Sequence, residues 1–119
     1  MKHKDAVVTL SALAQDSRLA IYRLLVKRGP EGFMPSDIAE KLEVPAPTLS
    51  FHLKELQRAE LIQVRREGRC LFYSPDFRHM NELIGFLNEN CCSLADKDCG
   101  PNCAPAQPAA VAELKRKRV

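Results

Sequence analysis

The chain has 119 residues, of which 45% are hydrophobic and 28% are charged, and its formal net charge is +3. This composition predicts one soluble globular domain. No apolar run reaches the roughly 18 residues of a membrane-spanning helix, and the N-terminal segment lacks the apolar stretch of a secretory signal, so we expect a cytoplasmic protein with no membrane partner.

Apolar residues at helical spacing predict two helices at the start of the chain. Leu10 and Leu13 belong to the apolar face of a first helix that covers residues 6–14. Asp16 or Ser17 is the expected N-cap of a second helix. Gly29-Pro30 should end that second helix, because neither residue continues a helix well.

A short third helix is predicted after Pro35-Ser36, and a fourth near Ala46-Pro47, where proline is tolerated in a first turn. In the later one, Leu49, Leu53 and Leu56 form one narrow apolar stripe, and the polar residues point away from it. A short helix, a tight turn and a second amphipathic helix are typical of a helix-turn-helix.

Residues 61–66 and 69–74 alternate as two strands, and Glu67-Gly68 is the expected turn between them. Cys70 alternates with Phe72, so we expect its thiol in the core, where free cysteine is readily buried. A helix-turn-helix that is followed directly by a basic hairpin predicts a winged helix.

The last predicted helix carries Phe77, Met80, Ile84, Leu87 and Cys91 on one stripe. Together with the apolar first helix, this is more apolar surface than so small a core needs, which predicts a homodimer. The fold class is therefore mainly α with a β-hairpin, in the order of four helices, two strands and a final helix. The expected interface residues are Val7, Leu10, Met80, Ile84 and Leu87.

Several segments resemble the ArsR/SmtB family of metalloregulatory repressors. They read LSALAQDSRL at 10–19, LSFHLKEL at 49–56, AELI at 59–62 and RREGR at 65–69. The resemblance implies a homodimeric winged-helix repressor that binds double-stranded operator DNA and releases it when a metal or metalloid binds. It implies neither an enzymatic activity nor an organic cofactor.

The fourth helix and the hairpin supply the candidate DNA contacts, because hydroxyl, imidazole and amide groups can read base edges and cationic groups neutralise phosphate. The candidates are Thr48, Ser50, His52, Lys54, Gln57, Arg65, Arg66 and Arg69. A two-fold dimer predicts half-sites about 10 base pairs apart. For Phe51 on the outer face, packing against the preceding helix and contact with a thymine methyl are both open.

Four of the five cysteines lie between Cys91 and Cys103, and this clustering is the most unusual feature of the sequence. In a reducing compartment, clustered cysteines more often bind metal or do redox chemistry than form structural disulfides. We expect a winged-helix and dimerisation domain over residues 1–92, then a cysteine-containing loop and a flexible basic tail over 93–119.

The usual arsenic site of the family, on the helix before the recognition helix, is absent, since residues 33–38 read FMPSDI. Cys91, Cys92 and Cys99 instead look like the ligands of variant arsenic repressors, whose three thiolates lie at the end of the last helix. Trivalent arsenic is the expected inducer and antimony a possible one, because thiolates favour soft ions. Cys103 is an optional fourth ligand or an accessory thiol.

Consecutive helical residues point about 100° apart, so both adjacent thiols can reach one ion only if the last helix ends near Asn90. Two alternatives stay open: a tetrahedral zinc or other divalent site with all four cysteines, and a thiol-redox sensor. A reductase is disfavoured, because no glycine-rich phosphate loop accompanies the cysteines. His3 and His79 are expected in solvent, and residues 115–118 are expected to form a loose basic tail.

Overall fold

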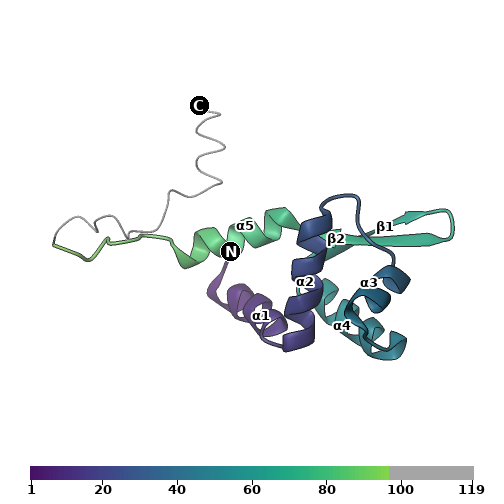
Figure 1. Ribbon diagram of the computed structural model, residues 1–119. Coiled ribbons are helices and arrows are strands. Elements are labelled where there is room, and N and C mark those ends of the chain that lie inside the picture. Colours follow the sequence, from purple (N-terminus) through teal and green to yellow (C-terminus); the bar gives the residue numbers. More distant parts are fainter. Residues whose placement is uncertain (97–119) are drawn as a thin grey trace.

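The computed structural model describes residues 1–96 (Figure 1). The elements are α1 (His3–Leu13), α2 (Asp16–Arg28), α3 (Pro35–Leu42), α4 (Ala46–Arg58), β1 (Ile62–Glu67), β2 (Cys70–Pro75) and α5 (Phe77–Leu87). The predicted fold class and element order are confirmed. Among the described residues, no helix is both long and apolar enough to cross a membrane.

The ends of α2 are set by local hydrogen bonds and by one glycine. The N-cap is Gln15, whose extended backbone lets its side-chain Oε1 accept from the Arg18 backbone N–H at 2.8 Å. The prediction of Asp16 or Ser17 at this position is wrong, because both lie inside the first turn. The predicted end is confirmed, since Gly29 follows the helix with φ of +86°, a conformation that glycine adopts at low cost.

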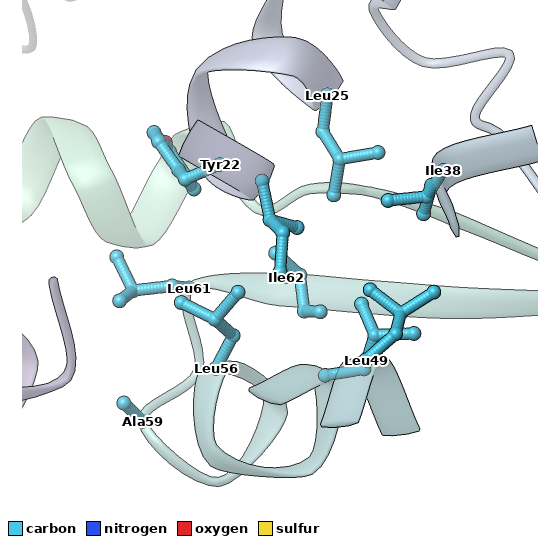
Figure 2. Packing of buried hydrophobic residues seen from close by; sticks show 10 residues of the cluster. Tyr22, Leu25, Ile38, Leu49, Leu56, Ala59, Leu61 and Ile62 are labelled. Carbon is cyan, nitrogen blue, oxygen red and sulfur yellow. The ribbon is translucent and has the colours of Figure 1, made fainter. Parts of the chain in front are cut away.

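The core is formed where α2, α3 and α4 pack against the start of the hairpin (Figure 2). Leu49, Leu53 and Leu56 are all buried there, which confirms the apolar stripe predicted for α4. Burial of a leucine or isoleucine side chain stabilises the fold by about 1.5–3 kcal/mol. The buried cluster consists of Ile21, Tyr22, Leu25, Ile38, Leu49, Leu53, Leu56, Ala59, Leu61 and Ile62.

The hairpin is an antiparallel pair whose register runs from Ile62 opposite Pro75 to Glu67 opposite Cys70. Its loop is therefore Gly68-Arg69, one residue later than predicted, with Gly68 at φ of +64°. The strand ends near α5 are buried and the tip is exposed. Cys70 lies at that exposed tip, so the expectation that its thiol is in the core is wrong.

A short backbone bridge adds a third segment to the base of the hairpin. Phe33 and Tyr73 exchange two backbone hydrogen bonds, at 3.0 and 2.9 Å. Gly32 makes this approach possible, because a Cβ at that position would lie 2.8 Å from the Tyr73 carbonyl oxygen. The loop between α2 and α3 is thereby attached to β2.

Helices α1 and α5 form the opposite part of the molecule from the hairpin tip (Figure 1). The buried Thr9 joins them, since its Oγ1 lies 3.0 Å from His79 Nε2 and donates to the Asp5 carbonyl. Glu60 Oε1 lies 4.0 Å from the other ring nitrogen of His79. The expectation that His79 is in solvent is therefore wrong, because its side chain is largely buried between these elements.

Candidate functional site

Helix α4 presents most of the predicted DNA-contacting side chains to solvent. The leucine stripe holds its inner face, and Thr48, Ser50, Lys54 and Gln57 are all exposed. Thr48 and Ser50 lie on different flanks of the helix, because residues two apart point about 160° from each other. Phe51 points outward and is 56% exposed.

A groove of about 430 Å³ separates one flank of α4 from strand β2. Ser50, Lys54 and Gln57 line it from α4, and Leu71 and Tyr73 line it from β2. Three of the predicted residues therefore share one flank and face the hairpin. The complete lining is Pro35, Ser36, Ala39, Ala46, Leu49, Ser50, Leu53, Lys54, Gln57, Leu71 and Tyr73.

His52 differs from the other predicted contacts, because only 7% of it is exposed. Its Nδ1 lies 3.4 Å from Arg18 Nη1, and the Phe51 ring meets the imidazole edge to face at 5.6 Å between centroids. Burial, together with the nearby Arg18 guanidinium, lowers the pKa of His52 below its ordinary value. His52 thus belongs to the buried inner face of α4, not to its exposed side.

The signal for this burial was present in the sequence. Leu49, His52, Leu53 and Leu56 follow the i, i+3, i+4, i+7 spacing of a buried helix face, and only the polarity of imidazole argued for the outside. The contact of His52 with Arg18 was missed, because nothing in the local pattern of α2 points to a partner 34 positions away.

The three hairpin arginines have different environments. Arg65 Nε donates to Glu67 at 2.8 Å, its Nη2 donates to the Glu31 carbonyl at 3.2 Å, and its guanidinium lies over the Phe72 ring. Arg65 therefore ties the hairpin to the loop after α2. Within residues 1–96, neither Arg66 nor Arg69 forms an ion pair, and both are exposed.

The pairing of the strands places Arg66 toward α4. Arg66 lies opposite Leu71, and directly opposed residues of an antiparallel pair share one face of the sheet. Leu71 lines the groove beside α4, so Arg66 extends the same surface. Arg69 stands in the loop at the hairpin tip. Both side chains are therefore exposed on the hairpin, Arg66 beside the groove and Arg69 at the tip.

The thiols of Cys91 and Cys92 lie together just beyond α5. The helix ends at Leu87, three residues before the expected end near Asn90, and residues 88–94 form turns, so the prediction that Cys91 lies on the stripe of this helix is wrong. Asn90 and Cys92 have φ of 59° and 63°, and this left-handed backbone brings the two Sγ atoms to 3.5 Å. The hydrogen bond with Cys91 is the main cause that raises the pKa of the Cys92 thiol, and burial adds to it.

The other predicted thiol ligands, Cys99 and Cys103, and the basic residues 115–118 lie outside the described residues. Among residues 1–96, no three His, Cys, Asp or Glu side chains lie close enough to hold one metal ion. The described part of the site is therefore a pair of thiols, which needs a further donor to complete a three-sulfur set.

An outward apolar face covers α1 and α5. We call it the α1–α5 apolar face, and it consists of Val7, Leu10, Ile84 and Leu87, all exposed. The exposed Val8 lies on the other flank of α1, beside Arg58 and Ala59. Met80, one of the predicted interface residues, is half-buried and packs against the core instead. The face continues along α5 to the residues that precede the thiol pair.

Comparison with known proteins gives the family. The model of a helix-turn-helix domain matches residues 13–65. The arsenical resistance operon repressor of Bacillus subtilis is 35% identical over 92 residues, which are 77% of this chain and 84% of that protein.

Two solved structures are also similar. HlyU from Vibrio cholerae is 30% identical, with a TM-score of 0.57 over 73% of this chain and 97% of that one. A homodimeric winged helix-turn-helix domain from Mycobacterium bovis, described as a possible ArsR-family regulator, is 26% identical, with a TM-score of 0.58 over 73% of this chain and 81% of that one. With its helix-turn-helix, its hairpin and these relatives, the chain belongs to the ArsR family of winged-helix transcriptional regulators.

Proposed function

We propose that the protein is a homodimeric repressor that leaves its operator when trivalent arsenic binds the thiolates of Cys91, Cys92 and Cys99. The observation that carries this proposal is the 3.5 Å separation of the Cys91 and Cys92 sulfurs directly after α5. The same helix supplies half of the α1–α5 apolar face, so a ligand bound there acts at the end of the proposed dimer interface.

The thiol pair fits a soft ion. Two sulfurs bound to one tetrahedral zinc at about 2.3 Å lie about 3.8 Å apart, and a pyramidal three-thiolate ion with narrower angles brings them closer. The observed 3.5 Å therefore needs little rearrangement for a shared ion. Cys99 would supply the third sulfur, and thiolate donors favour soft ions over hard ones.

In the DNA complex, α4 enters the major groove of each half-site. Thr48, Ser50, Lys54 and Gln57 face the bases and flanking phosphates, while Arg66 and Arg69 of the hairpin contact the backbone. The two-fold axis between α1–α5 apolar faces sets half-sites about 10 base pairs apart. His52 is left out of this set, because its ring is buried.

Salt dependence tests the hairpin contacts. Each phosphate contact that is lost lowers the slope of log affinity against log salt by about 1. We expect this change for Arg66→Ala and for Arg69→Ala. Arg65→Ala is the matched control and should change the slope less, because its guanidinium is held by Glu67 and the Glu31 carbonyl. Equal slopes for all three variants and the wild type would reject the assignment.

Release of DNA requires that the thiol site after α5 is coupled to the DNA-binding helix α4. Capture of the ion at the end of α5 shifts the two α5 helices relative to one another, and with them the two α4 helices. A coupling free energy of about 1–3 kcal/mol lowers operator affinity roughly 5- to 150-fold. The proposal thus requires no contact between the ion and the DNA.

Fluorescence anisotropy of a labelled operator, titrated with arsenite, tests this coupling. The wild type should release the operator, and serine substitution of Cys91, Cys92 or Cys99 should abolish release while leaving basal affinity intact. Cys70→Ser is the matched control, because this exposed cysteine lies at the hairpin tip and should leave release unchanged. Normal release of the operator by arsenite from the triple serine variant would remove the thiol site from the proposal.

A thiol-redox signal is the second candidate, favoured by the same close approach of two sulfurs. A peroxide could take two electrons and two protons from the pair, leaving a disulfide and water or an alcohol. Release by peroxide but not by arsenite would select this alternative.

X-ray absorption of the loaded protein distinguishes the bound ions: three sulfurs around arsenic or antimony support the first proposal, and four around zinc support a divalent-metal regulator.

A further inference from the structure

His52 connects three helices through one arginine. Arg18, in the first turn of α2, donates from Nε to the Ala12 carbonyl at 2.6 Å and directs Nη1 toward His52 Nδ1 at 3.4 Å. Ala12 lies in the last turn of α1, where helix carbonyls lack partners within the helix. The guanidinium therefore joins the C-terminal end of α1 to the inner face of α4.

The chemistry of these groups fixes the proton on the imidazole. Arginine carries only donors, so His52 Nδ1 must be the unprotonated acceptor, and the ring must be neutral with its proton on Nε2. The Phe51 ring covers one edge of the imidazole, and only 7% of the residue meets solvent. Nothing in this arrangement presents the imidazole to a base edge.

We propose that His52 is a positioning residue, which holds the recognition helix α4 at a set orientation to α1 by accepting from Arg18, and does not itself contact DNA. The inference rests on the proposed DNA binding by α4. Because α1 also carries part of the α1–α5 apolar face, the Arg18–His52 link joins the proposed dimer interface to the proposed DNA-reading helix.

Protonation of His52 would break this link. It would remove the acceptor at Nδ1 and place a second positive charge beside Arg18. Arg18 from α2 is the charged group in contact with the ring, and it also lines a hollow with Glu55 and Arg58 of α4, whose side chains are joined at 2.6 Å. Helix α1 contributes only the Ala12 carbonyl to these contacts. Operator affinity should therefore fall in mildly acidic solution.

Two isosteric variants separate positioning from DNA contact. His52→Asn keeps an acceptor near the Nδ1 position and cannot be protonated, whereas His52→Gln places its amide near Nε2. We expect wild-type affinity within about twofold for His52→Asn, and an affinity loss of about tenfold, the equivalent of one hydrogen bond, for His52→Ala and His52→Gln. Circular dichroism at the assay temperature confirms that each variant is folded.

The pH dependence of operator affinity distinguishes this role from a purely structural one, which would leave that dependence unchanged. Between about pH 8 and pH 5, a range that extends below the ordinary imidazole pKa of about 6.5 because burial lowers the pKa of His52, wild-type affinity should fall more steeply than that of His52→Asn. His3→Asn, the same change at an exposed histidine, is the matched control and should keep the wild-type profile. His79 is present in every one of these proteins, so its own effect on the profile cancels in the comparison.

A double-mutant cycle tests whether the residue acts through Arg18. The affinity losses of Arg18→Met and His52→Ala should be less than additive, because either one breaks the same link. The salt slope of His52→Ala should equal that of the wild type, since no phosphate contact is lost.

Three results would overturn the inference: affinity restored by His52→Gln but not by His52→Asn, a salt slope lowered by about 1 in His52→Ala, or identical pH profiles for wild type and His52→Asn. Failure of the wild type to bind any operator near pH 8 would instead reject the proposed function. The two failures are therefore distinguishable.

Discussion

Leu87, in the last turn of α5, offers the sharpest test of the proposed dimer. The side chain is 57% exposed, and burying a whole leucine stabilises by about 1.5–3 kcal/mol. Burying its exposed part in an interface is therefore worth roughly 0.9–1.7 kcal/mol per protomer. A two-fold interface contains the residue twice, so Leu87→Ser should raise the dimer dissociation constant roughly 20- to 300-fold.

Sedimentation equilibrium over a range of protein concentrations measures this constant directly. Leu19→Ser is the matched control, because Leu19 is 44% exposed but lies on α2, outside the α1–α5 apolar face. It should change the constant by less than about twofold. If Leu87→Ser had the same dimer dissociation constant as the control variant, the argument would be refuted, and the dimer would then use another surface.

Three further predictions concern the stability of the fold. The buried Tyr22 hydroxyl has no hydrogen-bond partner in the described part of the chain, so Tyr22→Phe should be neutral or stabilising by up to about 1 kcal/mol in urea unfolding. Gly32→Ala should cost roughly 2–3 kcal/mol, because φ is +78° and the new Cβ would meet the Tyr73 carbonyl; Gly68→Ala, with open space around it, should cost only about 1 kcal/mol. Burial lowers the pKa of His52 in the folded protein, so the unfolded chain binds a proton at this histidine at a higher pH. The contribution of His52 to the free energy of unfolding is therefore fully present above about pH 6.5 and is lost as the pH falls below that value. His52→Asn should reduce this loss of stability in acid.

Each of these has a measurement that would contradict it. All unfolding curves are compared at one protein concentration, because dimerisation raises apparent stability. A loss above about 1 kcal/mol in Tyr22→Phe would show that the hydroxyl has a partner. Equal costs at Gly32 and Gly68 would show that the loop after α2 relaxes away from β2. An unchanged pH dependence in His52→Asn would mean that other groups account for it.

Much of the fold could be read from local patterns. The leucine spacing of α4, the glycine after α2 and the alternation that becomes the hairpin all depend on neighbours within a few positions. The errors are also local in origin. Cys70 continues the alternation of its strand, but the hairpin tip projects beyond the core, so alternation there no longer means burial.

The candidate DNA contacts also include some residues that local patterns could place and one that they could not. Thr48, Ser50, Lys54 and Gln57 are exposed because they lie outside the leucine stripe, a consequence of helical periodicity alone. The sequence predicted the same phosphate-binding role for Arg65 as for Arg66 and Arg69. In the structure, however, the Arg65 guanidinium donates to backbone carbonyls more than 30 positions earlier in the chain. No pattern within the hairpin could have distinguished it from Arg66.

The amino-acid sequence by itself determined the order of the elements, the outward side of the recognition helix and the gathering of cysteines after the last helix, because these follow from periodicity and from spacing along the chain. Only the tertiary structure decided that the inward-facing His52 meets Arg18, that Arg65 is tied to the loop after α2, and that the Cys91 and Cys92 sulfurs meet. Those outcomes depend on long-range packing and on individual backbone angles, and neither of these has a signature in the order of residues.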